Sequence, residues 1–139
     1  MATTMAPERK TGTQPQQDER PFTLGSVWSV QLIRVKPGHG IEYARELAAK
    51  DKKLFEELKK EGLVLSYKIL RGPAASRDDF DTIFLVEYPS YAALDHMEKY
   101  DAIRQRVLGS LSQEQENMQK RAEIRESIGG KLMQEIHLK

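Results

Sequence analysis

The apolar pattern of this 139-residue chain changes abruptly near Gly40, where a strand gives way to a helix. Residues 27–35 (VWSVQLIRV) are rich in β-branched and aromatic side chains, which favour a strand, and residues 36–38 (KPG) supply turn chemistry. From about Gly40, apolar residues recur on one face at a helical period, and Gly62 is placed to cap the helix. The ordered part of the chain is therefore expected to begin with a strand followed by a long amphipathic helix.

Two further strands and a second helix follow. Residues 63–70 (LVLSYKIL) and 82–88 (TIFLVEY) have strand composition and are separated by a charged, turn-rich loop. Ser90 is a suitable N-cap for a helix that runs to about Leu108. These segments extend the predicted order to strand, helix, strand, strand, helix.

The C-terminal part is expected to add one helix and one strand. Ser112 and Gln115 have capping-box spacing, which predicts a third, mostly polar helix to about Ser127. The pair Gly129-Gly130 is expected to end it, ahead of a last strand at 132–138 (LMQEIHL).

This order predicts an α+β fold of the ferredoxin-like β-α-β-β-α-β type, with a four-stranded antiparallel sheet and an extra helix before the last strand. Residues 1–21 are rich in Thr, Gln, Pro and charge, and we expect them to be disordered. Residues 22–139 are expected to form a single domain, since their number is close to the commonest domain size.

Both faces of the predicted sheet carry apolar side chains. In the first strand, Trp28, Val30 and Leu32 alternate with a second set that includes Val27 and Ile33. A sheet with one solvated face would instead alternate apolar and polar residues. Since helices cover only one face in this fold, we expect two chains to stack their sheets face to face as a homodimer. A covering tail is the rival explanation, but the N-terminal segment is too polar to serve well.

The pattern from Val27 to Leu138 resembles the dimeric α+β barrel superfamily. The resemblance rests on element order, on VKPGHG before the long helix and on EYPSYAALDHM between the third strand and the second helix. Its members include cofactor-independent monooxygenases, haem-degrading enzymes, lactone isomerases and small stress-induced proteins, so the resemblance narrows the fold more than the activity. Haem-degrading members use Asn, Trp and His together, whereas the only asparagine here is Asn117, on the polar helix. This departure argues against haem degradation, and no cofactor is expected.

Composition excludes several classes of function. With 22 basic and 21 acidic residues the net charge is +1, so no bulk field attracts nucleic acid or an acidic membrane. There is no cysteine for a disulfide, a thiolate metal site or a thiol nucleophile. Three histidines far apart in sequence do not predict a metal site. No apolar run approaches the roughly 20 residues that span a bilayer. The compartment stays open: the cytoplasm is the default, and export would follow if a signal peptide preceded the chain.

Two polar residues lie where apolar ones are expected, and they are candidate catalytic groups. Asp51 falls near the centre of the apolar stripe of the long helix. It could serve as a general base, or it could pair with an arginine in a purely structural role. His96 falls on the apolar arc of the second helix and could act as an acid–base group or as a buried, hydrogen-bonded histidine. His39, before the long helix, could help to bind an anion or be an exposed loop residue.

A set of polar strand residues is the candidate ligand pocket. It is expected to bind a small organic molecule in a mixed polar and apolar cavity, if the face that carries it points into the dimer. With the last strand beside the first and the second beside the third, Lys68 and Glu87 could form a cross-strand pair. If these residues instead lie near sheet edges, they are simply hydrated. The set comprises Ser29, Gln31, Ser66, Lys68, Glu87 and Glu135, together with the third catalytic candidate, His137.

Three hypotheses for function follow from these residues. The chain is a small-molecule-binding homodimer of unknown activity, or it is a cofactor-independent monooxygenase- or isomerase-like enzyme in which His96, His137 or Asp51 lines a cavity. A non-catalytic binding or stress-related dimer, whose sheet face serves association alone, would instead have a filled interior without a cavity. A subunit that docks through the helix at 112–127 ranks last, because that helix has only scattered apolar residues.

Overall fold

A computed structural model describes residues 19–139 of the chain, so most of the predicted disordered segment, 1–21, lies outside the described residues. The predicted α+β class and the four-stranded antiparallel sheet are confirmed. The described residues form two compact units. One is made of residues 19–25 and 135–139, and the other, the main unit, of residues 26–134.

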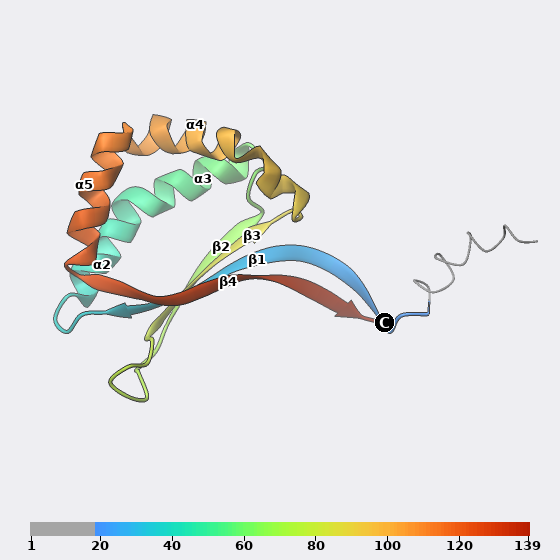
Figure 1. Cartoon of the computed structure of the whole chain (residues 1–139), viewed down its shortest axis with the longest axis horizontal. Coiled ribbons are helices and arrows are strands. Elements are labelled where there is room, and N and C mark those ends of the chain that lie inside the picture. Colours follow the sequence, from blue (N-terminus) through green and yellow to red (C-terminus); the bar gives the residue numbers. More distant parts are fainter. Residues whose placement is uncertain (1–18) are drawn as a thin grey trace, which may run out of the picture. The chain divides into compact units, whose positions relative to one another are not determined.

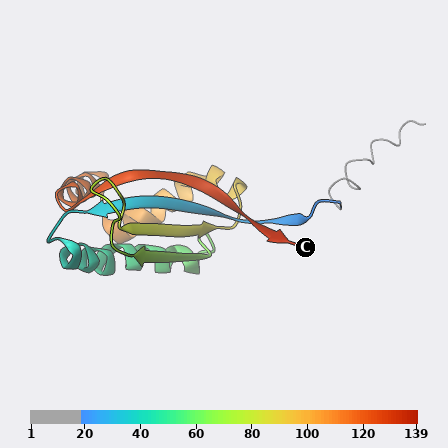
Figure 2. The same ribbon diagram turned by 90° about the horizontal axis from the view of Figure 1, so that it is seen from below.

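The sheet contains β1 (Phe22–Val35), β2 (Ser66–Arg71), β3 (Thr82–Tyr88) and β4 (Arg125–Leu138), in the order β2-β3-β1-β4. The last strand therefore lies beside the first, and the second beside the third. In the main unit, the helices lie on one face of this sheet (Figure 1), and Figure 2 shows the strands side by side with the helices behind them.

The long helix expected after residue 40 is present but is not uniformly α-helical. It consists of α2 (Gly40–Glu46), a π-helical turn η3 (Leu47–Asp51) and α3 (Lys52–Lys60). Gly62, with a φ of 74°, follows its end, and its amide donates to the carbonyl of Lys59 at 3.0 Å. This is the glycine cap that the sequence predicts, since glycine adopts a positive φ at little cost.

The second helix departs from the expected geometry at its beginning. The hydroxyl of Ser90 accepts a hydrogen bond from the amide of Ala93, at 3.2 Å, as a capping residue does. The next turn, however, is a 3₁₀ segment, η4 (Ala92–His96), and only then does α4 (Met97–Leu108) begin. A 3₁₀ turn rotates successive side chains by a different angle from an α-helix. The expected position of His96 on the apolar arc is therefore wrong, and its side chain is exposed.

The C-terminal elements begin earlier than the sequence indicates. Helix α5 spans Leu111–Ala122, and its N-cap is Ser110, whose hydroxyl accepts from the amide of Gln113 at 3.2 Å. Strand β4 begins at Arg125, so Gly129-Gly130 lies inside the strand and does not precede it. A Cβ added to Gly130 would approach the carbonyl oxygen of Val30 to 3.1 Å. The glycine therefore permits close backbone contact between strands, which a sequence pattern cannot distinguish from a stop signal.

The hydrophobic core lies between the sheet and the helices of the main unit. Val27 and Ile33 of β1 are fully buried, and Phe84 and Val86 of β3 are nearly so. In the β1–β3 register Ser29 is opposite Val86 and Gln31 is opposite Phe84, so these odd-numbered β1 residues share the helix-covered face. On α4, the hydroxyl of buried Tyr100 donates to the carbonyl of Leu63 at 2.7 Å and ties that helix to the loop before β2.

Replacing Tyr100 by Phe should lower the free energy of unfolding by about 1 kcal/mol, because the Leu63 carbonyl loses its partner while the ring is retained. Urea denaturation measures the change. The matched control is Tyr91→Phe, since Tyr91 is 48% exposed. Equal effects of the two substitutions would contradict the role given to the Tyr100 hydrogen bond.

Candidate functional site

The main unit contains a cavity of about 280 Å³ between its sheet and its helices. Strands β1 and β3 supply the floor, and side chains from α2, η3, α3, α4, α5 and the start of β4 form the walls. The apolar lining consists of Leu54, Phe55, Phe84, Val86, Leu108 and Met118. The polar lining consists of Ser29, Gln31, Tyr43, Lys50, Asp51, Tyr88, Arg104, Glu114, Asn117, Arg121 and Arg125.

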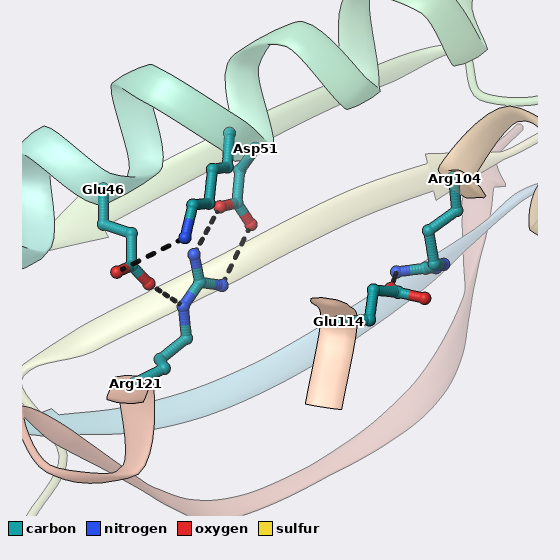
Figure 3. Close-up of polar contacts among 6 residues, drawn as sticks. Glu46, Asp51, Arg104, Glu114 and Arg121 are labelled. Atoms are coloured by element: carbon teal, nitrogen blue, oxygen red, sulfur yellow. Dashed lines mark hydrogen bonds and ion pairs between the residues drawn. The ribbon is translucent and has the colours of Figure 1, made fainter. Parts of the chain in front are cut away.

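One wall of the cavity is an ion-pair cluster centred on Arg121 of α5 (Figure 3). Its guanidinium forms a two-pronged contact with Asp51, with Nη2–Oδ1 and Nη1–Oδ2 distances of 2.7 and 3.3 Å. Its Nε donates to Oε1 of Glu46 at 2.6 Å. The Asp51 and Arg121 side chains are each only 15% exposed. Such a planar fork is the strongest arrangement of an arginine with a carboxylate.

The charge of Arg121 is held in place by these partners. Burial alone would lower the pKa of Arg121, but the hydrogen bonds and charges of Asp51 and Glu46 outweigh it and raise the pKa above its ordinary value. The guanidinium therefore stays protonated throughout the physiological range. The sequence is compatible with Asp51 as a general base or as the partner of an arginine. The structure supports the second interpretation, with Arg121 as the partner.

A second ion pair joins α4 and α5 at another part of the wall. Arg104 Nη1 lies 3.7 Å from Oε2 of Glu114 (Figure 3). Lys50 Nζ lies 3.9 Å from Oε2 of Glu46, and so adds a cation to the Arg121 cluster. The wall is therefore built largely from charged side chains that neutralise one another.

Tyr43 of α2 lies between two arginines. The guanidinium carbons of Arg121 and Arg125 lie 5.8 and 5.6 Å from the centre of its ring, within cation–π range. Burial raises the pKa of the Tyr43 phenol, and the two arginines offset only part of this effect. Burial likewise raises the pKa of Tyr88 on the floor. Both hydroxyls are therefore protonated donors at neutral pH.

Several polar groups of the lining make no hydrogen bond to another described side chain or backbone group. They are the hydroxyls of Ser29, Tyr43 and Tyr88 and the side-chain amides of Gln31 and Asn117. Polar groups in protein interiors are normally paired. The cavity thus offers hydrogen-bond donors and acceptors beside apolar side chains, and this mixed composition is typical of sites for small organic molecules.

The structure divides the predicted polar set between two faces of the sheet. Ser29 and Gln31 line the cavity on the helix side. Ser66 pairs with Glu87, and Lys68 with Leu85, so these β2 residues and Glu87 lie on the opposite face. The expected Lys68–Glu87 pair is not formed: Lys68 Nζ lies 5.7 Å from the centre of the Trp28 ring, and Glu87 accepts from Ser66 at 2.7 Å.

The remaining candidates lie away from the cavity. His96 is exposed, with Nδ1 3.8 Å from Oε1 of Glu98. Glu135 and His137 belong to the smaller unit, where His137 Nε2 lies 4.0 Å from Glu135 Oε2 and its ring rests against Gly25. His39 contacts Oε1 of Glu42 at 2.8 Å on the surface. Of the three catalytic candidates, only Asp51 lines the cavity.

The basic and tyrosine residues of the site are not among the residues that the sequence pattern predicts as functional. A usable signal exists in α5: Glu114, Asn117, Met118 and Arg121 follow the i, i+3, i+4, i+7 spacing of one helix face, and all four line the cavity. Because most of this stripe is polar, it resembles a solvated surface. Only the folded structure shows that the stripe faces Asp51.

Comparison with protein-family models, with curated proteins and with solved structures found no match to this chain. Among residues 19–139, no three His, Asp or Glu side chains converge as metal ligands would. No helix in the described part of the chain has the length and apolar character needed to cross a membrane. The candidate site therefore rests on its own geometry.

Replacing Asp51 by Asn should lower the free energy of unfolding by about 2 kcal/mol, because a largely buried arginine loses its charged partner and keeps only Glu46. Guanidinium denaturation measures the loss. Asp101→Asn, at an exposed position of α4, is the matched control and should change stability little. A neutral effect of Asp51→Asn would show that the cluster does not hold the cavity wall.

Proposed function

We propose that this chain binds a small organic molecule in the helix-side cavity and acts as a homodimer. The observation that carries the first part is the lining itself, in which unpaired hydroxyls and amides surround an apolar floor of aromatic and aliphatic side chains. A cavity that served only packing would be filled by side chains or lined by apolar groups. Its volume of about 280 Å³ suits a small ligand, since pockets for drug-sized molecules span roughly 300–1,000 Å³.

The open face of the sheet supports the dimer. On this face, opposite to the helices, lie the even-numbered residues of β1 and β2 and the odd-numbered residues of β3. In β4, Glu126 contacts Arg34 of this face whereas Arg125 lines the cavity, so the even-numbered β4 residues also lie here. Its apolar members are Trp28, Val30, Leu32, Leu70, Ile83, Leu85, Ile128 and Leu132. Leu70, Ile128 and Leu132 are 52%, 38% and 43% exposed. A contiguous apolar patch of this kind is typical of an interface.

Several polar groups of the open face are already paired within the chain. Glu87 accepts hydrogen bonds from Ser26 and Ser66 at 2.5 and 2.7 Å. Arg34 Nε donates to Oε1 of Glu126 at 3.0 Å. Burying these groups against a second copy therefore leaves fewer unmet hydrogen bonds. Two such sheets stacked face to face would form the dimeric α+β barrel of the ferredoxin-like, split β-α-β type.

Binding is favoured over catalysis by the state of the ionisable groups. Asp51, the only catalytic candidate at the cavity, has both carboxylate oxygens engaged by Arg121. Burial keeps the phenols of Tyr43 and Tyr88 protonated at neutral pH. These groups are suited to donate to and orient a ligand. A monooxygenase- or isomerase-like activity stays the alternative prediction.

A fragment screen monitored by protein NMR tests the cavity. Binders should shift resonances of lining residues such as Ser29 and Phe84 and leave those of the open face unchanged. Ser29→Leu should fill part of the cavity and weaken every such binder at least tenfold, whereas Ser112→Leu, on the exposed side of α5, should not. The absence of any cavity binder from a chemically diverse library would refute the binding function.

Native mass spectrometry tests the dimer and should give a species of twice the chain mass. Leu132→Glu should shift it to monomer, because a carboxylate would be buried in the apolar interface. Leu111→Glu, at a 66% exposed position of α5, is the matched control and should leave the dimer intact. A parent chain that is monomeric at micromolar concentration would favour a covering tail over a second copy.

A further inference from the structure

We propose that the ligand of this cavity is a small monoanion with a flat apolar body, and that Arg125 receives its anionic end. This inference rests on the proposed binding function and specifies the chemistry of its ligand. It depends on the charge balance of the lining, on the surroundings of Arg125 and on the shape of the apolar floor.

The cavity has one positive charge in excess. The four cations of its lining are Lys50, Arg104, Arg121 and Arg125. Three carboxylates pair with these cations. Glu46 contacts Lys50 and Arg121. Asp51 contacts Arg121, and Glu114 contacts Arg104. Four cations less three carboxylates leave a net charge of +1. A ligand with one negative charge would neutralise the site, and a dianion would reverse its sign.

The unbalanced cation is Arg125. Within residues 19–139, no carboxylate lies at ion-pair distance from its guanidinium, and Nη1 is buried without a hydrogen-bond partner. The guanidinium carbon lies 5.6 Å from the centre of the Tyr43 ring, and the face of that ring offers no oxygen or nitrogen acceptor. A buried guanidinium nitrogen without a hydrogen-bond partner is costly, and a ligand oxyanion that paired with it would recover that free energy.

Arg34 provides an internal comparison. Its Nη1 is also buried without a partner, but Glu126 neutralises its charge on the open face of the sheet. Arg125 differs because its charge is unmatched and because it lines the cavity. The same substitution can therefore be made at Arg34, whose charge is neutralised by a carboxylate, and at Arg125, whose charge is not.

The apolar side chains of the lining define the rest of the ligand. Phe55 and Phe84 have ring centres 5.4 Å apart, and Leu54, Val86 and Met118 extend the apolar surface around them. Such a surface suits an aromatic or alicyclic body more than a strongly hydrated one such as inorganic phosphate. Together with the single excess charge, it points to an aromatic or alicyclic carboxylate, or a phenolate of similar size.

The test compares 2-naphthoate with 2-naphthamide, which have the same shape but differ in charge. Calorimetric titration of the full-length protein should show naphthoate binding about tenfold more tightly, as expected for one charge-assisted hydrogen bond. Arg125→Gln should abolish the preference for naphthoate over the amide. Arg125→Lys should retain a preference for the acid, and Arg34→Gln should retain it in full.

Several results would overturn the inference. The first is equal affinity of the parent protein for the acid and the amide, which needs no variant to be folded. A naphthoate preference that survives in folded Arg125→Gln would remove Arg125 from the role. If neither compound binds while the fragment screen finds neutral or cationic ligands in the cavity, the binding function stands and the monoanion is wrong. If that screen also finds nothing, both proposals fail.

Discussion

The contact of Arg121 with Asp51 and Glu46 determines how the helices stand over the sheet. It joins α5 to the helical segment 40–60 through hydrogen-bonded ion pairs. Both Arg121 and Asp51 are largely buried, so removing either one would leave the other as an unpaired buried charge and destabilise the fold. Because this wall is made of paired polar groups, it lines a cavity between the helices and the sheet where apolar side chains would pack as core.

The π-helical turn at 47–51 belongs to this arrangement. Asp51 ends the turn, and the next helical segment, α3, begins one residue later. Such turns inside α-helices occur frequently at functional sites, because they redirect side chains without ending the helix. Here the π-helical turn contains Asp51, the carboxylate in the apolar stripe of the helix, and Asp51 forms its ion pair with Arg121 of α5.

The two faces of the sheet support different parts of the proposed function. The helix face holds the core and the cavity, whose floor includes the polar residues Ser29 and Gln31. The open face carries apolar side chains, and some of its polar groups form pairs such as Glu87 with Ser66. Strand β1 thus supplies alternate residues to the cavity and to the open face. Changes on one face can therefore be made with limited effect on the other.

The order of strands and helices, the glycine cap at Gly62 and the apolar character of both sheet faces can be predicted from the amino-acid sequence, because these features depend on local propensity and on periods of 2 and 3.6 residues. The sequence also marks Asp51 as misplaced for a simple core. The folded structure alone reveals that His96 is exposed, that Gly130 lies within a strand, and that Arg121 and Arg125 reach Tyr43. The exposure of His96 follows from a local 3₁₀ turn, whereas the other two facts depend on contacts between residues far apart in the chain. A helix face that looks solvated in sequence carries no information about the residues it contacts.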